Sequence, residues 1–275
     1  MPQAGSILAN VRVLVGDPDR DFLTDAIGLD WINEGQRRFA HKVLSLDEIA
    51  DFTVTAKQPR FDLPTDTIMP IWVTWYKNRV VKLDYATPYQ WAKLKEAWPT
   101  ANGTPDQYTI IRSQLEVGPQ RPTANSATAL ASGEMTSAVT TLNLTAASGT
   151  FRAKGWVKIE SEIIEYTAVA TTTLTGAVRG VHNTDAATHA SGKQMTEVDL
   201  QMLYRKTSKV ITATGTTLEI PAAFHVYVEK YVLYLAWLAR GDSVKAAAAL
   251  AELEGYEGAA IKTVGRRAQD GLMRI

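Results

Sequence analysis

Two histidines and an aspartate that lie close together in the chain are the first residues that could do chemistry. His182 and His189 flank Asp185 in a segment rich in Gly and Asn. Two imidazoles and one carboxylate can hold a transition metal. Alternatively, a tight turn uses the imidazoles for local hydrogen bonds. No further ligand has metal-like spacing, so we favour the turn and predict no metal or cofactor.

Three glutamates form a second candidate. Glu160, Glu162 and Glu165 lie near Tyr166, and a glycoside hydrolase needs two carboxylates across a cleft. Along a strand, side chains alternate between faces, so Glu160 and Glu162 would share one face and Glu165 would take the other. We interpret this cluster as the solvated edge of a sheet.

The common catalytic motifs are missing from the sequence. The chain has no cysteine, which excludes disulfides, thiolate nucleophiles and Cys-based zinc sites. Gly192-Lys193 lacks the preceding glycine and the following Ser or Thr of a phosphate-binding loop. Neither G-x-S-x-G nor H-E-x-x-H occurs. We therefore predict that the protein is not an enzyme.

The charge of the chain is balanced, with 29 Lys and Arg against 29 Asp and Glu. A protein that grips nucleic acid over its whole surface is expected to be basic. Aromatic residues could stack on bases, but few basic residues interleave them, and we favour core or subunit-interface packing. The most apolar run, residues 231–239, is too short to cross a bilayer, so no membrane contact is predicted. The aromatic positions are 72, 75, 76, 89, 91 and 98.

Helices are expected at both ends of the chain. Apolar residues recur at helical spacing over residues 6–15, and Gly16 ends that pattern. A longer helix is predicted from Thr24, as N-cap, to about residue 46. Further helices are predicted from Pro221 to about residue 240 and from about residue 243 to 267. The helix after Pro221 is apolar almost all round, so more than one neighbour must cover it.

Between these helices the pattern is that of β-strands. Short strands are predicted within residues 52–63, and hairpins over 71–84 and 108–117. A short helix opens at Pro88, since Pro suits the first turn. Strands are also predicted over residues 199–205 and 209–220.

The composition changes in the middle of the chain. Residues 120–133 are rich in Pro, Thr, Ser and Ala and predict a linker. Strands are predicted at 140–145 and within 155–178, with no amphipathic helix between 126 and 198. The predicted fold class is α+β, a helical scaffold with β-hairpins plus an inserted all-β domain. The predicted domains are residues 1–125 (scaffold), 126–197 (inserted β-domain) and 198–275 (C-terminal helices and tail).

Three stretches, in this order, resemble the head-to-tail adaptor (connector) proteins of tailed bacteriophages. They are DWINEGQRRFAHKVL, GTPDQYTIIRSQLEVGPQRP and LEIPAAFHVYVEKYVLYLAWLARGD. The resemblance implies a virion structural protein at the head-tail junction, assembled in the host cytoplasm. It implies a ring of twelve copies beneath the portal protein, lining the DNA exit channel. Tail or nozzle proteins and tail fibres would be further partners, and DNA would pass without specific binding.

A ring subunit needs two further covered surfaces, and the C-terminal helices offer them. Mid-helix glycines cost about 1 kcal/mol each relative to Ala, and close helix approach is the best reason to tolerate them. The expected ring interface comprises Tyr227, Tyr234, Trp237, Ala251, Gly255 and Ala259.

The end of the chain combines basic with large apolar residues, which is more typical of a docking segment than of a core element; fraying is the alternative. The resemblance implies the portal as its partner. The expected docking residues are Arg266, Arg267, Leu272, Met273, Arg274 and Ile275.

The inserted segment resembles a small β module of phage structural proteins. In that module E-I-I-x-Y, T-T-L-T-G, R-G and A-A-x-H-x-x-G recur in this order. Residues 162–166, 172–176, 179–180 and 186–192 match them, and Asn183-Thr184 replaces the usual Gly-Thr. His189 is then expected to be a structural residue of its loop. An alternative function is a carrier of a surface β module that binds host carbohydrate or tail fibres.

Overall fold

The computed structural model describes residues 3–43, 46–54, 59–77, 80–96, 102–118, 121–122, 127–131, 135–145 and 151–272. The chain forms two compact units. The first comprises Met1–Asp47, Asp66–Met69 and Arg205–Ile275, and the second comprises Glu48–Thr65 and Pro70–Tyr204. Both helices and sheets are extensive, so the predicted α+β class is confirmed.

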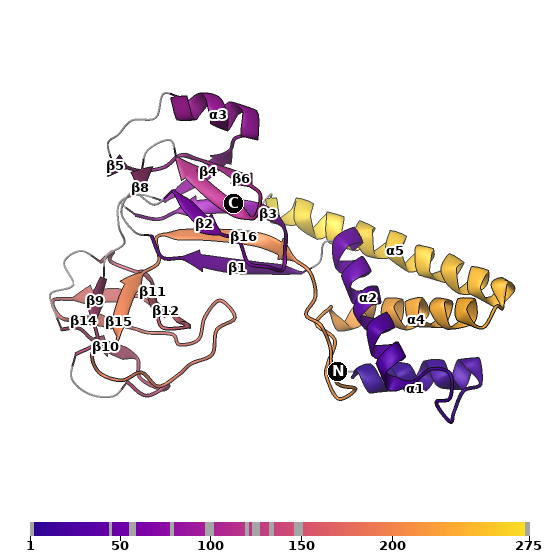
Figure 1. Ribbon diagram of the computed structural model, residues 1–275. Helices are drawn as coiled ribbons and strands as arrows, with labels where there is room; N and C mark the ends of the chain where they lie inside the picture. The colour runs from indigo at the N-terminus through magenta and orange to yellow at the C-terminus, as the bar shows by residue number, and fades with distance from the viewer. Residues whose placement is uncertain are drawn as a thin grey trace. The chain divides into compact units, whose positions relative to one another are not determined.

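The first unit is helical (Figure 1), and capping contacts define two of its helix ends. Gly16 ends the first helix in the left-handed conformation, with φ 68°, and its N–H bonds back into the last turn. The Thr24 hydroxyl accepts the Ile27 N–H at 3.3 Å and caps the second helix. The helices are α1 (Ala4–Val15), α2 (Asp25–Val43), η1 (Ala222–Phe224, a 3-10 turn), α4 (His225–Ala239) and α5 (Ser243–Leu272).

Helix α4 is apolar almost all round because α1, α2 and α5 all contact it. The Tyr227 ring lies 4.9 Å from the Phe39 ring of α2. A Cβ atom at Gly28 would lie 2.4 Å from the Leu8 side chain, so glycine allows α1 and α2 to approach. The predicted helices are confirmed, and α5 runs past the predicted end at residue 267.

The strand predicted over residues 209–220 is wrong. This segment is irregular apart from an isolated bridge between Thr217 and Gln3. Side chains take the backbone hydrogen bonds that a strand would use: the Ile211 N–H donates to Asn33 at 2.7 Å, and the Glu219 N–H donates to Gln36 at 3.1 Å. The Thr-rich composition therefore predicted a strand where the chain forms turns and bends.

The second unit contains a seven-stranded sheet whose order is β1-β16-β3-β4-β6-β7-β2. Phe52 and Phe61 lie on its two edge strands, yet their rings are 5.5 Å apart, so the sheet curls round its core. Both predicted hairpins are confirmed, although Asn78 lies outside the described residues. The strands are β1 (Asp47–Phe52), β2 (Arg60–Asp62), β3 (Thr67–Trp75), β4 (Val81–Tyr85), β6 (Gln107–Ile111), β7 (Gln114–Gly118) and β16 (Leu200–Lys206).

One helix, α3 (Pro88–Glu96), packs on this curled sheet, and β5 (Asn102–Gly103) pairs with β8 (Arg121–Pro122). The core inside the curl comprises Val54, Phe61, Val73, Trp75, Leu83, Tyr108, Leu115, Val117, Leu200, Met202 and Tyr204.

A second, separate core lies between Leu130 and Met195, within the segment that we predicted as the inserted domain. Two small sheets enclose it, with orders β12-β11-β15-β9 and β10-β14-β13. We call this part the β module. Its strands are β9 (Ala127–Ala129), β10 (Thr141–Asn143), β11 (Gly155–Ile159), β12 (Glu162–Tyr166), β13 (Ala168–Ala170), β14 (Thr173–Thr175) and β15 (Gln194–Glu197).

The linker predicted over residues 120–133 is wrong in part. β9 pairs antiparallel with β15, and Leu130 after it is buried. Ala and Thr have short side chains with little apolar surface, so the composition did not indicate this strand.

Within the part of the chain that the structure describes, none of the helices has the length and apolar character of a membrane span.

Candidate functional site

The two histidines that could have bound a metal are engaged with carboxylates instead. His182 Nδ1 lies 2.7 Å from Asp51 Oδ2. His189 Nδ1 lies 2.8 Å from Glu160, and its Nε2 lies 2.8 Å from Glu162. Within the described ranges, no group of three or more His, Asp or Glu side chains could hold a metal ion. The imidazoles lie in a loop as predicted, but their hydrogen bonds are not local to it, because the partners are 27 to 131 residues away in the chain.

Glu162 was predicted to lie at a solvated sheet edge, and this is wrong. Its carboxylate is fully buried and ionised. Arg179 donates to both carboxylate oxygens, at 2.7 and 2.6 Å. The N–H groups of Gly180 and Ala187 add bonds of 3.0 and 3.1 Å. Burial alone would raise the pKa of Glu162, but these donors and His189 outweigh it and lower the pKa to about 2.

This arrangement explains why R-G and A-A-x-H accompany E-I-I-x-Y in one module, since all three contribute to a single buried carboxylate. A carboxylate that is ionised and saturated with donors cannot serve as the general acid of a glycosidase, so Glu162 does not have that role. Glu160 occupies the exposed turn before β12, with φ 53°. Glu165 is half-buried on β12.

A second buried carboxylate fixes α3. Glu116 on β7 accepts from Trp91 Nε1 at 2.6 Å, pairs with Lys95 Nζ at 2.7 Å and also binds Arg60. Burial raises the pKa of Glu116, but these donors outweigh it, and the pKa is lowered. Trp91 is buried, as predicted for a core aromatic, and its bond to Glu116 connects α3 to the sheet.

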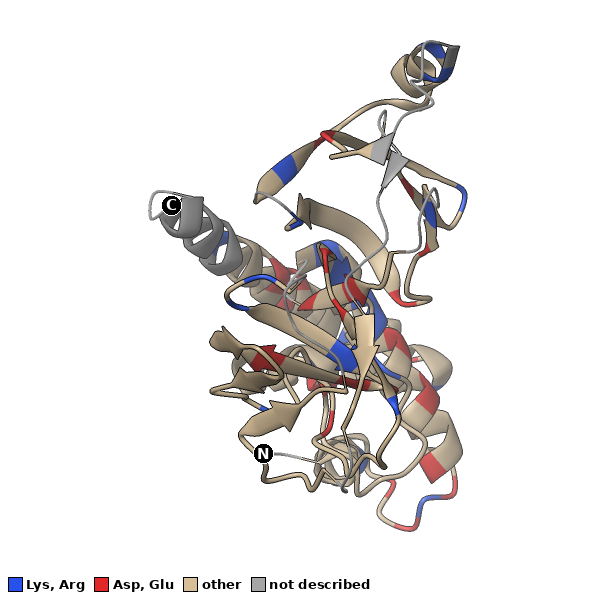
Figure 2. Cartoon of the chain, turned by 90° about the vertical axis from the view of Figure 1, so that its left-hand side faces the viewer, with Lys and Arg blue, Asp and Glu red and all other residues tan. Residues whose placement is uncertain are grey.

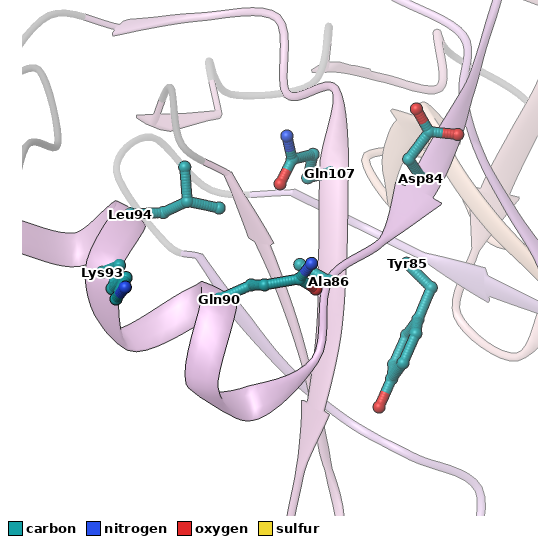
Figure 3. A pocket seen from close by; sticks show the side chains of 7 residues that line it. All are labelled: Asp84, Tyr85, Ala86, Gln90, Lys93, Leu94 and Gln107. Carbon is teal, nitrogen blue, oxygen red and sulfur yellow. The ribbon is translucent and has the colours of Figure 1, made fainter.

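An open pocket of about 470 Å³ lies between α3 and the ends of β4 and β6. Figure 3 shows Gln90 and Leu94 reaching from α3 toward the strand of Gln107, whereas Tyr85 points away from Gln107. The Gln90 oxygen is already used, because it accepts the Thr87 N–H at 2.9 Å. No nucleophile lies beside a base here, so the pocket offers no catalytic arrangement. It is lined by Asp84, Tyr85, Ala86, Gln90, Lys93, Leu94 and Gln107.

A third buried carboxylate positions α5. Glu257 accepts from Arg38 of α2 at 3.1 Å and from Tyr227 of α4 at 2.7 Å. Lys42 of α2 adds a bond of 2.7 Å. Burial alone would raise the pKa of Glu257, but the three donors outweigh burial, and the pKa is lowered. Glu257 thus determines which face of α5 packs against α2 and α4.

In this orientation, one face of α5 is not covered by the described residues. The face opposite the core carries Val244, which is 79% exposed, and the exposed small residues Ala251, Gly255 and Ala259. Nothing among the described atoms lies within 4 Å of a Cβ built at Gly255 or Gly258. The close helix approach that would justify these glycines is therefore not supplied by the described residues of the chain itself.

The other predicted interface residues lie on α4. Tyr234 and Trp237 are half-buried, and Lys245 Nζ lies 4.2 Å from the Trp237 ring centre. Tyr227 is 1% exposed and belongs to the core of the helical unit.

The predicted docking tail begins as helix, because α5 continues to Leu272. The side chains of Arg266, Arg267 and Leu272 lie outside what the structure describes. So do Met273, Arg274 and Ile275 altogether, and docking by the tail stays a prediction.

The β module is attached to the curled sheet by polar and aromatic contacts. Trp156 of β11 packs edge-on against Tyr76, with ring centres 5.2 Å apart. Asn183 donates to Glu48 of β1 at 3.0 Å. Arg152 binds Glu197 at 2.9 Å and lies 3.5 Å from the buried Asp199, where the chain passes from β15 to β16.

Figure 2 shows acidic and basic residues interspersed over the described elements.

Glu116, Glu197 and Glu257 were not predicted from the sequence as buried carboxylates. A signal exists for Glu257, which falls on the same helical row as the buried Leu253 and Ala260. A charge on an apolar row indicates a buried partner.

The comparisons with known proteins agree with the resemblance in the sequence. The model of a protein family described as SU10 adaptor protein matches residues 2–274. No curated protein matches the chain.

Proposed function

The chain belongs to the SU10 adaptor protein family, and we propose on that premise that it forms a ring joining the portal vertex of the head to the tail. The family is one of phage adaptors, so the protein is a structural component of the virion. The prediction of a phage adaptor is therefore confirmed. The family is not one of enzymes. The ring, its place at the head-tail junction and its twelve-fold symmetry are the proposal.

The uncovered face of α5 carries this proposal. A helix face exposed to water normally bears charged residues, but positions 244, 248, 251, 255 and 259 hold only Val, Ala and Gly. Small residues allow a second helix to approach closely. A neighbouring subunit is the partner that a ring provides.

A ring also requires a different, matching surface on each copy, because its contacts are heterologous. The helix α1 contacts α4, as α5 does, and exposes Val13 at 76% and Leu14 at 53%. Leu238 of α4 is 52% exposed. These residues supply the apolar area from which a second surface can be built.

Balanced charge supports a role around a DNA channel. Each phosphate that a protein neutralises adds affinity and would slow the passage of DNA. With 29 basic and 29 acidic residues, the chain suits a channel through which DNA slides without specific binding. Portal protein, neighbouring adaptor subunits and tail or nozzle proteins are the proposed partners.

No observation favours the alternative of a carbohydrate-binding module. Sugar sites in proteins expose aromatic rings, but Tyr166 is buried and Trp156 packs against Tyr76. The domain limits at residues 126 and 197 remain part of the proposal.

A matched pair of substitutions on α5 tests the ring. Ala251→Arg places a long charged side chain on the uncovered face, whereas Glu254→Arg places the same side chain on the charged flank. We expect Ala251→Arg to abolish assembly of the adaptor with portal protein, measured as complex mass by light scattering, while Glu254→Arg assembles normally. Circular dichroism should show the same helix content for both. Normal assembly of Ala251→Arg would exclude this face from the interface.

A further inference from the structure

A fully buried carboxyl group, that of Asp199, lies where the chain passes from the β module to the curled sheet. Neither of its oxygens has a hydrogen-bond partner among the described residues. Buried polar groups are normally hydrogen-bonded, and burying a charge without such bonds is strongly unfavourable. This position therefore accommodates the protonated carboxyl group more easily than the charged one.

The two cations nearest to Asp199 do not compensate its charge well. Arg152 Nη2 lies 3.5 Å from one carboxylate oxygen, and Lys77 Nζ lies 3.9 Å from the other, and both distances are too long for good hydrogen bonds. Arg152 instead donates from Nε to Glu197 at 2.9 Å and from Nη2 to the Val198 carbonyl at 2.6 Å. Its charge therefore mainly balances that of Glu197.

The surroundings change the acidity of Asp199 accordingly. Burial, and after it the negative charge of Glu197, raise the pKa of Asp199 to about 7, although Arg152 and Lys77 act in the opposite direction. The carboxyl group thus gains or loses its proton near neutral pH.

The tyrosines that pack at this place do not change their charge in the same range. The Tyr166 hydroxyl donates to Glu197 at 2.5 Å, and the Tyr76 ring centre lies 5.4 Å from the guanidinium carbon of Arg152. Burial raises the pKa of both tyrosine hydroxyls above the ordinary value of 10.0. Both tyrosines therefore stay neutral near pH 7.

The backbone on the two sides of this carboxyl group is bound by different parts of the chain. The Val198 N–H donates to the Trp156 carbonyl of β11 in the β module at 2.8 Å. The Asp199 carbonyl accepts the N–H of Tyr76, which follows β3 of the curled sheet, also at 2.8 Å. We call Val198 and Asp199, with their bonds to Trp156 and Tyr76, the module joint. A charge on Asp199 acts directly on these bonds.

We propose that the module joint is controlled by a proton on Asp199: the neutral carboxyl group keeps the β module attached to the curled sheet, and ionisation loosens the attachment. The direction follows from linkage. The folded pKa of Asp199 lies above the ordinary value of 3.8, so the closed joint holds a proton that the open joint releases. The stability that this proton contributes is complete below pH 3.8 and declines as the pH rises toward 7.

A purely structural ion pair of Asp199 with Arg152 and Lys77 would have the opposite sign. Such a pair would lower the pKa of Asp199, and the joint would then be strongest while the carboxylate is charged. Replacing Asp199 by Asn separates the two roles, because Asn has the shape of the neutral carboxyl group and cannot ionise.

Hydrogen exchange of the full chain at pH 5 and pH 8, corrected for the intrinsic pH dependence of exchange, tests the proposal at the amides of Tyr76 and Val198. In the wild type we expect their protection to fall by about tenfold or more from pH 5 to pH 8, since one pKa unit corresponds to a factor of ten. In Asp199→Asn the protection should change little with pH. At pH 8 it should exceed that of the wild type by about tenfold.

Two control variants show whether the effect belongs to Asp199. Asp185→Asn makes the same chemical change at an exposed residue of the β module and should behave like the wild type. His182→Gln removes the histidine of the pair with Asp51, whose ring lies 5.5 Å from the Trp156 ring. The pH dependence at the module joint should persist in this variant.

Four results would overturn the proposal. The first is wild-type protection at the module joint that does not change between pH 5 and pH 8. The second is weaker protection in Asp199→Asn than in the wild type at pH 8, as an ion pair predicts, or failure of this variant to fold. The third is a pH dependence that remains in Asp199→Asn. The fourth is a pH dependence that disappears in His182→Gln, because the histidine–carboxylate pair would then be its cause.

Discussion

Replacing Glu162 by Gln should strongly destabilise the β module, because the structure gives this carboxylate five donors and no solvent. The substitution keeps the shape but removes the charge that balances Arg179, whose side chain is only 6% exposed. It also turns an amide N–H₂ group toward donors. Removing one partner of a buried ion pair costs about 3 to 5 kcal/mol. We expect a loss in that range for Glu162→Gln.

Native-state hydrogen exchange of β11 and β12 is the suitable assay, because it reports the free energy of opening of the module alone. Glu165→Gln is the matched control, since Glu165 lies on the same strand and is half-buried. The control should change the opening free energy by less than about 0.5 kcal/mol. A similarly small change for Glu162→Gln would refute the central role of this carboxylate.

Acid should reproduce the effect in the unaltered protein. The folded pKa of Glu162 lies below its ordinary value, from 4.5 down to about 2. The resulting stability is therefore present above pH 4.5 and is lost as the pH falls toward 2. The shift corresponds to roughly 3 kcal/mol. Exchange of β11 and β12 should accelerate over this range in the wild type and much less in Glu162→Gln.

Three further predictions concern the other elements. Glu257→Ala should lower the stability of the helical unit by about 2 to 4 kcal/mol, because it leaves the buried Tyr227 hydroxyl without its acceptor. Tyr227→Phe should cost only about 1 kcal/mol. Thermal melting at 222 nm measures both losses, and equal losses would contradict a central role of Glu257. Trp91→Phe should lower the free energy of unfolding by about 1.5 to 3 kcal/mol through the lost bond to Glu116. Urea denaturation measures this loss, and an unchanged free energy of unfolding would show that other contacts attach α3 to the sheet. Truncation after Val264 should weaken binding to portal protein in a pull-down titration without lowering the melting temperature, and undiminished affinity would exclude tail docking.

Periodic patterns predicted most of the fold. The helices α1, α2, α4 and α5 and both hairpins follow from the spacing of apolar residues along a local stretch. The failures arose where the structure depends on distant partners. Residues 209–220 have a strand-like composition, but Asn33 and Gln36 of a distant helix take their backbone hydrogen bonds.

Among the candidate residues, too, local patterns predicted some features, and others depend on distant partners. Glu162 could not be identified as buried from alternation along β12, because its charge is balanced by Arg179 from 17 residues away. The resemblance to a recurring phage module contained the necessary signal, since Arg179 and His189 recur with it. The small residues on one face of α5 were predicted from their helical spacing, whereas their exposure opposite the core is known only from the structure.

The mass of the complex between this protein and its portal protein shows whether the protein assembles as a ring. Light scattering or native mass spectrometry of the purified mixture gives the number of adaptor chains per portal ring. If the protein forms a ring on the portal, one closed species with as many adaptor copies as portal subunits is expected. A mixture in which the adaptor stays monomeric, or binds with a smaller and variable number of copies, would contradict it.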